Sequence, residues 1–174
     1  MIMNFENVGT IKVELSAIDA QWIQKFVSDT KLPYVEIGTR YGGSSLFARI
    51  ANKDIDIYTI DPKPDWSCWN IDPKEIGINS IVGYSLDVAK TWDKPIGVLF
   101  IDGYHIGTAA KDDYYAWEKF VVKGGVILIH DYSFQDKRFK DVFDCCNEIM
   151  KDTSYEIVFV PDEVAKTSVV ILKK

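Results

Sequence analysis

The stretch of sequence that decides the fold is Tyr34–Ser45, which reads YVEIGTRYGGSS. Its first four residues predict a short strand, and the glycines that follow predict a tight turn. The next residues, SSLFARIA, have the pattern of a helix start, with Ser44 or Ser45 near the N-cap. A second apolar run, Ile55–Ile60, predicts another strand. A strand, turn, helix and strand in this order are typical of a parallel α/β sheet.

The same alternation continues on both sides of this unit. Ser16 or Asp19 is expected to cap a helix that runs to about Asp29, and the segment PDEVAKT, residues 161–167, is too short to be a crossover helix. The sequence therefore predicts a Rossmann-like, doubly wound α/β fold with a seven-stranded sheet, mostly parallel, that ends in an antiparallel C-terminal hairpin. Further strands are expected at Ile81–Gly83, Ile96–Ile101, Gly125–His130, Tyr155–Val160 and Ser168–Leu172, and further helices near 86–91, 107–120 and 137–151.

Composition limits the class of protein. With 47% hydrophobic residues, the 174 residues are enough for one buried core, so we expect a single domain over residues 1–174. Twenty Lys and Arg against 26 Asp and Glu give a net charge of −6. Binding of nucleic acid or of an anionic membrane usually needs a basic excess, so neither partner is expected. A small-molecule ligand fits this composition better.

The cysteines and the N-terminal segment bear on the cellular compartment of the protein. The three cysteines contain no Cys-x-x-Cys pair, which argues against a disulfide framework and a structural zinc site and favours the cytoplasm. The first residues lack the basic and apolar regions of a signal peptide, and no apolar run approaches about 18 residues. We therefore expect neither export nor a membrane span. The sequence does not decide whether the chain forms a homo-oligomer.

The connection at residues 62–79 is expected to be irregular, because it carries three prolines and no clean periodicity. It leaves the second strand beside the predicted ligand edge, so we expect a mobile lid that orders when ligand binds. Trp66 and Trp69 have two interpretations. They stack on an acceptor, or they pack beneath the loop as core residues.

Ionisable side chains follow three of the predicted strands. Asp61 ends the second strand, at a position where an acidic residue commonly accepts hydrogen bonds from ribose hydroxyls. Asp102 and His105 follow the fourth strand, and His130 and Asp131 follow the fifth. The carboxyl edge of an open α/β sheet is where ligands bind. Carboxylates there suit Mg²⁺ or another divalent cation, and an imidazole suits a metal ligand or a base. Turn capping is the structural alternative for the aspartates.

Several motifs taken together resemble a known family. EIGTRYGGSS, YTIDP, DGYH, Lys111-x-Asp113 with Trp117, and GGVILIHDY resemble class I S-adenosylmethionine-dependent methyltransferases over residues 34–132. The resemblance is closest to the macrocin O-methyltransferase and cephalosporin hydroxylase-like group. It implies a divalent cation, with Mg²⁺ preferred, at Asp102, His130 and Asp131. It implies S-adenosylmethionine as cofactor, bound by Glu36, Gly38, Thr39, Gly42, Ser44, Asp61, Ser85, Leu86 and Asp102.

The reaction that this resemblance implies is methyl transfer to an oxygen of a small hydroxylated acceptor, sugar-like or phenolic. Asp102, His105 and His130 would be the catalytic residues, and either imidazole suits a base near neutral pH. Two alternatives keep the cofactor: non-methyl chemistry, or a degenerate binding module, to which the departures from the family at Tyr104 and Gly107 point. An NAD-dependent oxidoreductase is disfavoured, because the glycines are spaced Gly-x-x-x-Gly rather than Gly-x-Gly-x-x-Gly.

Overall fold

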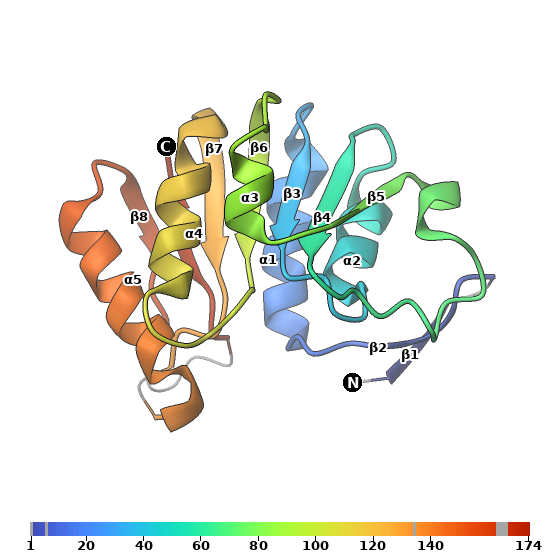
Figure 1. Ribbon diagram of the computed structural model, residues 1–174, viewed down its shortest axis with the longest axis horizontal. Helices are drawn as coiled ribbons and strands as arrows, with labels where there is room; N and C mark the ends of the chain where they lie inside the picture. The colour runs from blue at the N-terminus through green and yellow to red at the C-terminus, as the bar shows by residue number, and fades with distance from the viewer. Residues whose placement is uncertain (1, 6, 134, 163–166) are drawn as a thin grey trace.

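A seven-stranded sheet forms the centre of the computed structural model, which describes residues 2–5, 7–133, 135–162 and 167–174 (Figure 1). The sheet order is β5-β4-β3-β6-β7-β9-β8. Neighbouring strands from β5 through β4, β3 and β6 to β7 pair in parallel. Strand β9 pairs antiparallel with β7, and β8 pairs antiparallel with β9. This confirms the predicted fold class. The strands are β3 (Tyr34–Ile37), β4 (Ile57–Asp61), β5 (Ile78–Val82), β6 (Ile96–Ile101), β7 (Val121–Ile129), β8 (Glu156–Phe159) and β9 (Val170–Lys173).

The strand order reverses between β3 and β6, at the middle of the sheet. Ile37, the last residue of β3, pairs with Ile60 of β4 and with Ile101 of β6. The carboxyl ends of these strands are therefore level with one another. Ligands of open α/β sheets bind in the crevice at such a reversal.

Helices cover both faces of the sheet. Figure 1 shows α1 (Ala17–Asp29) and α2 (Gly43–Ala51) on one side, and α3 (Ser85–Ala89), α4 (Ala109–Trp117) and α5 (Lys140–Asp152) on the other. Successive strand residues point to opposite faces. Tyr34 and Val98 accordingly join the core beneath α1 and α2, whereas their neighbours Val35 and Leu99 join the core beneath α3, α4 and α5.

A two-stranded antiparallel sheet precedes α1, and the sequence analysis did not predict it. It consists of β1 (Ile2–Phe5) and β2 (Gly9–Lys12). Ile11 and Val13 bury their side chains against the α1 and α2 side of the core. Their alternation with the exposed Lys12 is the period-2 signal that could have revealed β2.

The connection after β4 is partly built into the core, which corrects the predicted lid. Trp69 is only 8% exposed, forms a β-bridge with Gly9, and donates its indole N–H to the Tyr41 carbonyl at 2.9 Å. Trp66 lies edge-on to Trp69, with 5.0 Å between the ring centroids. Of the two interpretations of the tryptophans, packing beneath the loop holds for Trp69, because its indole fills space between β2 and the glycine turn.

Several element boundaries also differ from those predicted. Strand β5 begins at Ile78 rather than 81, because the 3₁₀ helix η1 (Pro73–Ile76) ends at Gly77 with φ 75° and returns the chain to the sheet early. Gly42, with φ 71°, is the N-cap of α2 in place of Ser44 or Ser45. Ser16 caps α1 as expected. Strand β7 begins at 121 rather than 125, with a register shift between its pairings at Ile96 and Val98 of β6.

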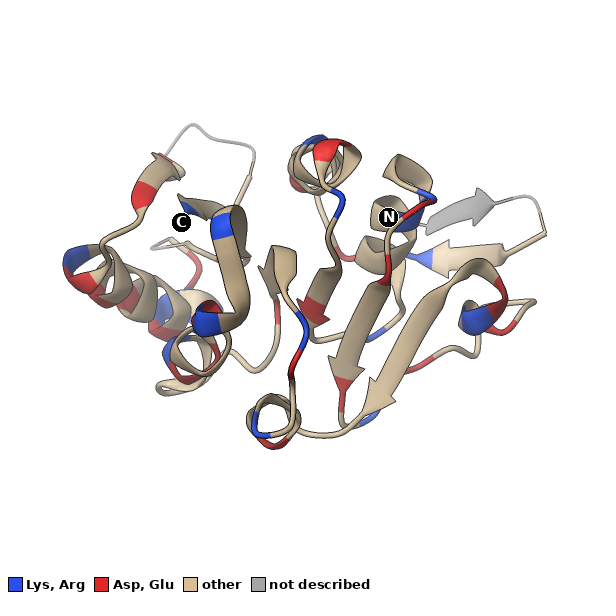
Figure 2. Cartoon of the chain, turned by 90° about the horizontal axis from the view of Figure 1, so that it is seen from above, with Lys and Arg blue, Asp and Glu red and all other residues tan. Residues whose placement is uncertain are grey.

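The predicted helices near 107–120 and 137–151 each contain a tighter turn, η2 (Glu118–Phe120) after α4 and η3 (Lys137–Phe139) before α5. Of the expected hairpin connection, residues 163–166 lie outside the described residues. Figure 2 shows Lys and Arg positions interspersed with Asp and Glu over helices and loops. No helix in the described part of the chain has the length and apolarity needed to span a bilayer.

Candidate functional site

The glycine turn after β3 packs directly against the turn after β6. Gly38 has φ 91°, and a Cβ there would lie 2.0 Å from the carbonyl oxygen of Asp102. The Asp102 N–H in turn donates to the Ile37 carbonyl at 2.9 Å. Only glycine tolerates both the positive φ and this close approach. The predicted cofactor turn and the predicted acidic edge are therefore in contact.

Glu36 lies beneath this turn and is fully buried. Its carboxyl group accepts hydrogen bonds from the hydroxyls of Ser44 and Ser45, in the first turn of α2. Burial raises the pKa of Glu36 to about 8, although the two serine hydroxyls act in the opposite direction. Glu36 and Ser44 thus support the turn from inside the fold.

Asp61, at the end of β4, braces the same turn from the side. Its Oδ2 accepts the N–H groups of Thr39 and Arg40, each at 3.0 Å, and its Oδ1 accepts the Lys63 N–H at 2.7 Å. A carboxylate oxygen can accept about two hydrogen bonds. Among the described residues Oδ1 accepts one, so it retains capacity for a ligand hydroxyl.

Ser85 and Leu86 begin α3, which follows β5. The Ser85 hydroxyl donates to Asp113 of α4 and accepts the Trp117 indole N–H at 3.4 Å, whereas the Leu86 side chain is exposed. Burial raises the pKa of Asp113 to about 6. Sequence reasoning gave Asp113 no role, although its Lys-x-Asp spacing was the available signal.

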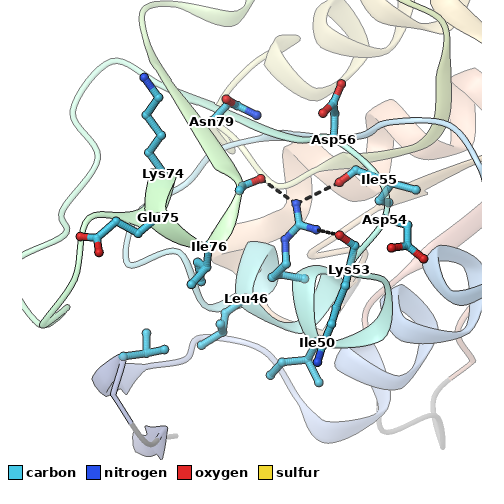
Figure 3. Close-up of a pocket in the computed structure, with 13 residues that line it drawn as sticks. Leu46, Ile50, Lys53, Asp54, Ile55, Asp56, Lys74, Glu75, Ile76 and Asn79 are labelled. Carbon is cyan, nitrogen blue, oxygen red and sulfur yellow. Dashed lines mark hydrogen bonds between the residues drawn. The ribbon is translucent and has the colours of Figure 1, made fainter.

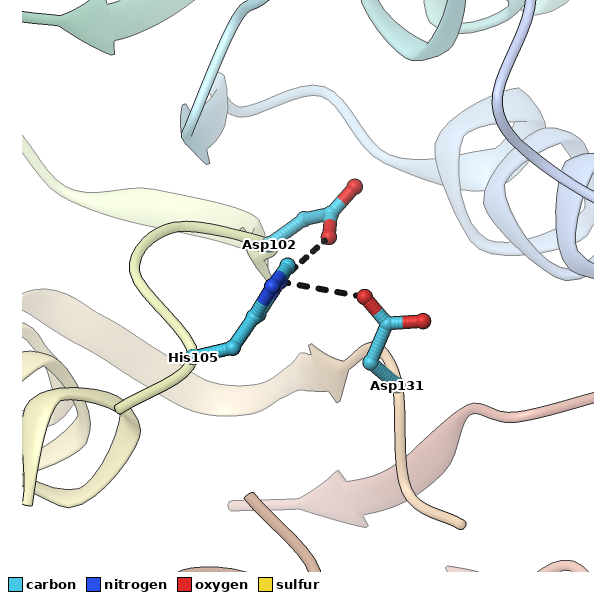
Figure 4. Close-up of side chains that lie close together, drawn as sticks. All are labelled: Asp102, His105 and Asp131. Carbon is cyan, nitrogen blue, oxygen red and sulfur yellow. Dashed lines mark ion pairs between the residues drawn. The ribbon is translucent and has the colours of Figure 1, made fainter. Parts of the chain in front are cut away.

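Asp102, His105 and Asp131 converge where β6 and β7 end (Figure 4). His105 Nε2 lies 3.0 Å from Asp131 Oδ2 and 3.6 Å from Asp102 Oδ1. One ligand atom from each residue lies within 4.8 Å of the other two. All three side chains are partly accessible, and the His105 side chain is 35% exposed. Two carboxylates and an imidazole at this spacing fit a divalent cation.

His130 lies on the buried side of the same carboxylates and is 6% exposed. Its Nδ1 is 3.1 Å from Asp102 Oδ1 and 3.3 Å from Asp131 Oδ1. The structure therefore brings together the four residues that the sequence placed at the ends of β6 and β7. His105 faces the accessible side of the carboxylate pair, and His130 faces the core.

The charges in this cluster compensate one another. Asp102 and Asp131 raise the pKa of His105 to about 9. Burial alone lowers the pKa of His130, but the carboxylates around it outweigh burial and raise it well above its usual value. Burial likewise raises the pKa of Asp131, and the two imidazoles outweigh that effect and hold it well below its usual range. The imidazoles and the carboxylates of this cluster thus favour one another's charged forms.

Local backbone geometry and α5 hold the cluster in place. Asp131 has φ 61°, a left-handed conformation that is uncommon for any residue but glycine and is better tolerated by Asp than by most. Gly107 donates its N–H to Asp141 of α5 at 2.7 Å, and Phe139 lies edge-on to the His105 ring at 5.2 Å. The sequence analysis did not identify Phe139 or Asp141, because neither follows a strand.

A separate pocket opens at the amino ends of β4 and β5, away from this edge (Figure 3). Lys53, Lys74 and Glu75 are among the residues that line it. The Arg49 guanidinium in the pocket donates to backbone carbonyls, among them those of Ile55 and Gly77. Arg49 therefore ties α2 to the sheet, and none of the predicted site residues lines this pocket.

The sequence matches a known protein family and a curated relative. Residues 35–132 match the model of a family described as a methyltransferase domain. An uncharacterized protein of Acanthamoeba polyphaga mimivirus is 36% identical over an alignment of 138 positions, and the match covers 70% of this chain and 60% of that protein. The chain thus spans about 60% of the length of this curated relative.

Solved structures share the fold at low identity. An O-methyltransferase from Bacillus cereus in complex with SAH (S-adenosylhomocysteine) has a TM-score of 0.69 and 15% identity, over 92% of this chain and 83% of that one. An SAH-bound methyltransferase from Podospora anserina has a TM-score of 0.71 and 15% identity, over 91% and 78%. The family match covers more than half of this chain and includes the glycine turn and all four edge residues. The chain therefore belongs to the methyltransferase domain family.

Proposed function

We propose that this chain transfers a methyl group from S-adenosylmethionine to an oxygen of a small hydroxylated acceptor, sugar-like or phenolic, with the help of a divalent cation. The observation that carries the proposal is the contact between the glycine turn and the carboxylate cluster. Gly38 packs on the backbone of Asp102, whose side chain pairs with His105 and His130. A donor in the turn and an acceptor at the cluster would therefore be neighbours, and positioning of this kind is a large part of catalysis.

The turn and the adjacent strand ends offer contacts for each part of the cofactor. Gly38, Thr39 and Gly42 would line its methionine end, with Glu36 and Ser44 beneath them and Asp102 beside them. The free capacity of Asp61 Oδ1 suits a ribose hydroxyl, and Ser85 with Leu86 would flank the adenine. When bound, the cofactor supplies the methyl group on a sulfonium centre.

Asp102 and Asp131 would hold the cation, with an imidazole as third ligand. Oxygen donors favour Mg²⁺, and Asp102, His105 and Asp131 offer donor atoms within 4.8 Å of one another. If His105 acts as the base, His130 is the third ligand, because its Nδ1 lies 3.1 Å from Asp102 Oδ1 and 3.3 Å from Asp131 Oδ1. A cation bound there would acidify an acceptor hydroxyl. His105 is better placed than His130 to accept a proton from that hydroxyl, because it faces the accessible side of the pair. Without a cation, the two carboxylates hold the pKa of His105 at about 9. A cation bound to them would lower that pKa, so we expect turnover to rise with pH and to level off below 9.

The test has two parts. Calorimetry with S-adenosylhomocysteine (SAH) measures cofactor binding, and a labelled-methyl assay over a panel of sugars and phenols measures transfer, with Mg²⁺ and with excess EDTA. We expect SAH to bind and the transfer to require Mg²⁺. Absence of SAH binding would overturn the whole proposal. Transfer that is unchanged in EDTA would overturn only the cation.

A second candidate, cofactor binding without methyl transfer, is favoured by one observation. A Cβ placed on Gly107 would meet no described atom within 4 Å, so the cluster lacks a side-chain wall on that side. If this candidate is correct, calorimetry would show that SAH binds, and the labelled-methyl assay would show no methylation of any acceptor in the panel.

A further inference from the structure

Asp19 is a buried acid with no role in the proposed function. It lies in the first turn of α1 and is only 2% exposed. It completes a capping box, because the Ser16 N–H donates to Asp19 Oδ2 and the Asp19 N–H donates to the Ser16 hydroxyl, both at 3.1 Å. Capping alone requires no burial, since most such residues lie at the surface.

The same carboxylate reaches the candidate site. Asp19 Oδ2 lies 3.4 Å from Nε2 of His130, and Ser168 Oγ lies 3.3 Å from the same nitrogen. The opposite nitrogen, Nδ1, faces Asp102 and Asp131. The imidazole is thus held between an acid of α1 on one side and the carboxylate pair of the site on the other.

We propose that Asp19 is a positioning residue of the site: it accepts the Nε2–H of His130 and so presents Nδ1 to Asp102 and Asp131. The proposal rests on the proposed function for its consequence, which is a prearranged cation site. A histidine beside a metal usually donates its other ring N–H to a carboxylate, which sets both the tautomer and the ring orientation. Asp19 and His130 have this arrangement across 111 positions of sequence.

A purely structural role for Asp19 is the competing explanation. Its Oδ1 accepts the Thr167 hydroxyl and the Ser168 N–H, the latter at 3.3 Å, and these contacts join α1 to the segment before β9. This tie uses the other carboxylate oxygen, so it can be tested separately. Thr167→Val removes part of the tie, and Ser16→Ala breaks the helix cap. Neither changes an atom that contacts His130.

Proton NMR on the whole chain tests the contact directly. The chain has only two histidines, so the ring N–H signals of His130 are assigned by their loss in His130→Gln. Correlation with the ¹⁵N-labelled ring nitrogens then separates Nε2–H from Nδ1–H. We expect a downfield, slowly exchanging signal in the parent, in Ser16→Ala, in Thr167→Val and in Ser168→Ala. Asp19→Ala should lose it. A signal that survives Asp19→Ala, or one that is lost in Ser168→Ala alone, would overturn the assignment.

Mn²⁺ binding, measured by calorimetry without cofactor, tests the consequence. Loss of such an outer carboxylate typically weakens metal binding about 10- to 100-fold, which we expect for Asp19→Ala, whereas Ser16→Ala and Thr167→Val should stay within about twofold. In a His130→Gln background Asp19→Ala should have no further effect. Equal weakening in Asp19→Ala and Thr167→Val would show a structural role.

The two proposals fail in different ways. A parent protein that binds no Mn²⁺ would overturn the cation site, while the NMR signal would still decide whether Asp19 holds His130. If Asp19→Ala does not fold, Asp19→Asn keeps the shape of the side chain and removes its charge. Asp19→Asn should then weaken Mn²⁺ binding by more than Thr167→Val does, and an equal effect would overturn the positioning role.

Discussion

Acidic side chains at the carboxyl edge are stabilised in three different ways. Glu36 is buried and hydrogen-bonded by two serine hydroxyls, with its pKa raised to about 8. Asp61 accepts three backbone N–H groups. Asp102 and Asp131 pair with His105 and His130. Asp61, Asp102 and Asp131 are partly accessible, but only Asp102 and Asp131 place two carboxylates side by side, where a ligand that brings its own positive charge can use them.

Asp131→Asn should weaken Mg²⁺ or Mn²⁺ binding at least about tenfold, because it removes one of two anionic ligands. Asn also tolerates the left-handed backbone at this position, so the fold should be retained. The pKa of His105 should fall from about 9, because one of the two carboxylates that raise it is lost. Calorimetry and an NMR pH titration measure the two effects.

Asp136→Asn is the matched control for Asp131→Asn. Asp136 lies five positions further along and pairs with Arg138, so its loss changes the net charge equally without touching the cluster. If both variants bind the cation as the parent does, Asp131 is not a ligand.

Glu36→Gln should reduce the pH dependence of stability. The pKa of Glu36 rises from an ordinary 4.5 to about 8 on folding, so the folded state binds more protons between these values. The stabilisation of the folded state that this pKa shift provides is therefore complete below pH 4.5 and is lost as the pH rises through 8. Gln cannot ionise, so the free energy of unfolding of the variant should fall less across this range. Asp113 and the histidines keep part of the slope.

Urea unfolding at several pH values across this window measures the effect of Glu36→Gln. Asp113→Asn is the comparison, because the pKa of Asp113 rises only to about 6 and its contribution is lost at lower pH. A Glu36→Gln profile parallel to that of the parent would mean that Glu36 ionises normally in the folded protein.

At the scale of elements, the turn after β3 is enclosed by three segments that are distant in sequence. The turn after β6 packs on Gly38, and Trp66 of the connection after β4 lies over Gly42, where a Cβ would come within 2.1 Å of its ring. The β2 segment covers the other side through the bridge between Gly9 and Trp69. We therefore expect cofactor affinity to depend on β2 and on the connection after β4, in addition to the residues that contact the cofactor.

Trp69→Ala should lower the free energy of unfolding by about 3–5 kcal/mol, the usual cost of truncating a buried aromatic side chain. Its indole also donates a hydrogen bond to Tyr41. Trp66→Ala should cost less, because Trp66 is only partly buried. Chemical denaturation of both variants tests this order. Equal losses in the free energy of unfolding would contradict the finding that Trp69 is buried and Trp66 only partly so.

For the molecule as a whole, SAH should raise the midpoint of thermal unfolding and NAD should not. At about 100 times its dissociation constant, a ligand stabilises the folded state by about 2.7 kcal/mol. For a chain of this size each kcal/mol shifts the midpoint by about 2–4 °C, so we expect roughly 5–10 °C. An equal shift with NAD, or none with SAH, would contradict the proposed cofactor.

The sequence by itself determined the α/β class, the order of the helices and strands from α1 onward, and the polar residues that end the strands. These features follow from local patterns. A buried parallel strand is a short apolar run, and the first ionisable residue after it must lie at the edge of the sheet. Asp61, Asp102, His105, His130 and Asp131 were predicted at this edge for that reason, and they lie there.

Only the tertiary structure decided how these residues pair. The placement of His130 between Asp19 and the carboxylate pair, and of Trp69 in the core, depends on how α1, the β2 segment and the connection after β4 pack on the sheet. Contacts of this kind join residues that are far apart in sequence, such as Asp19 and His130, which are separated by 111 positions. Hydrophobic periodicity specifies which face of an element is buried, but it carries no information on which distant side chain will meet that face.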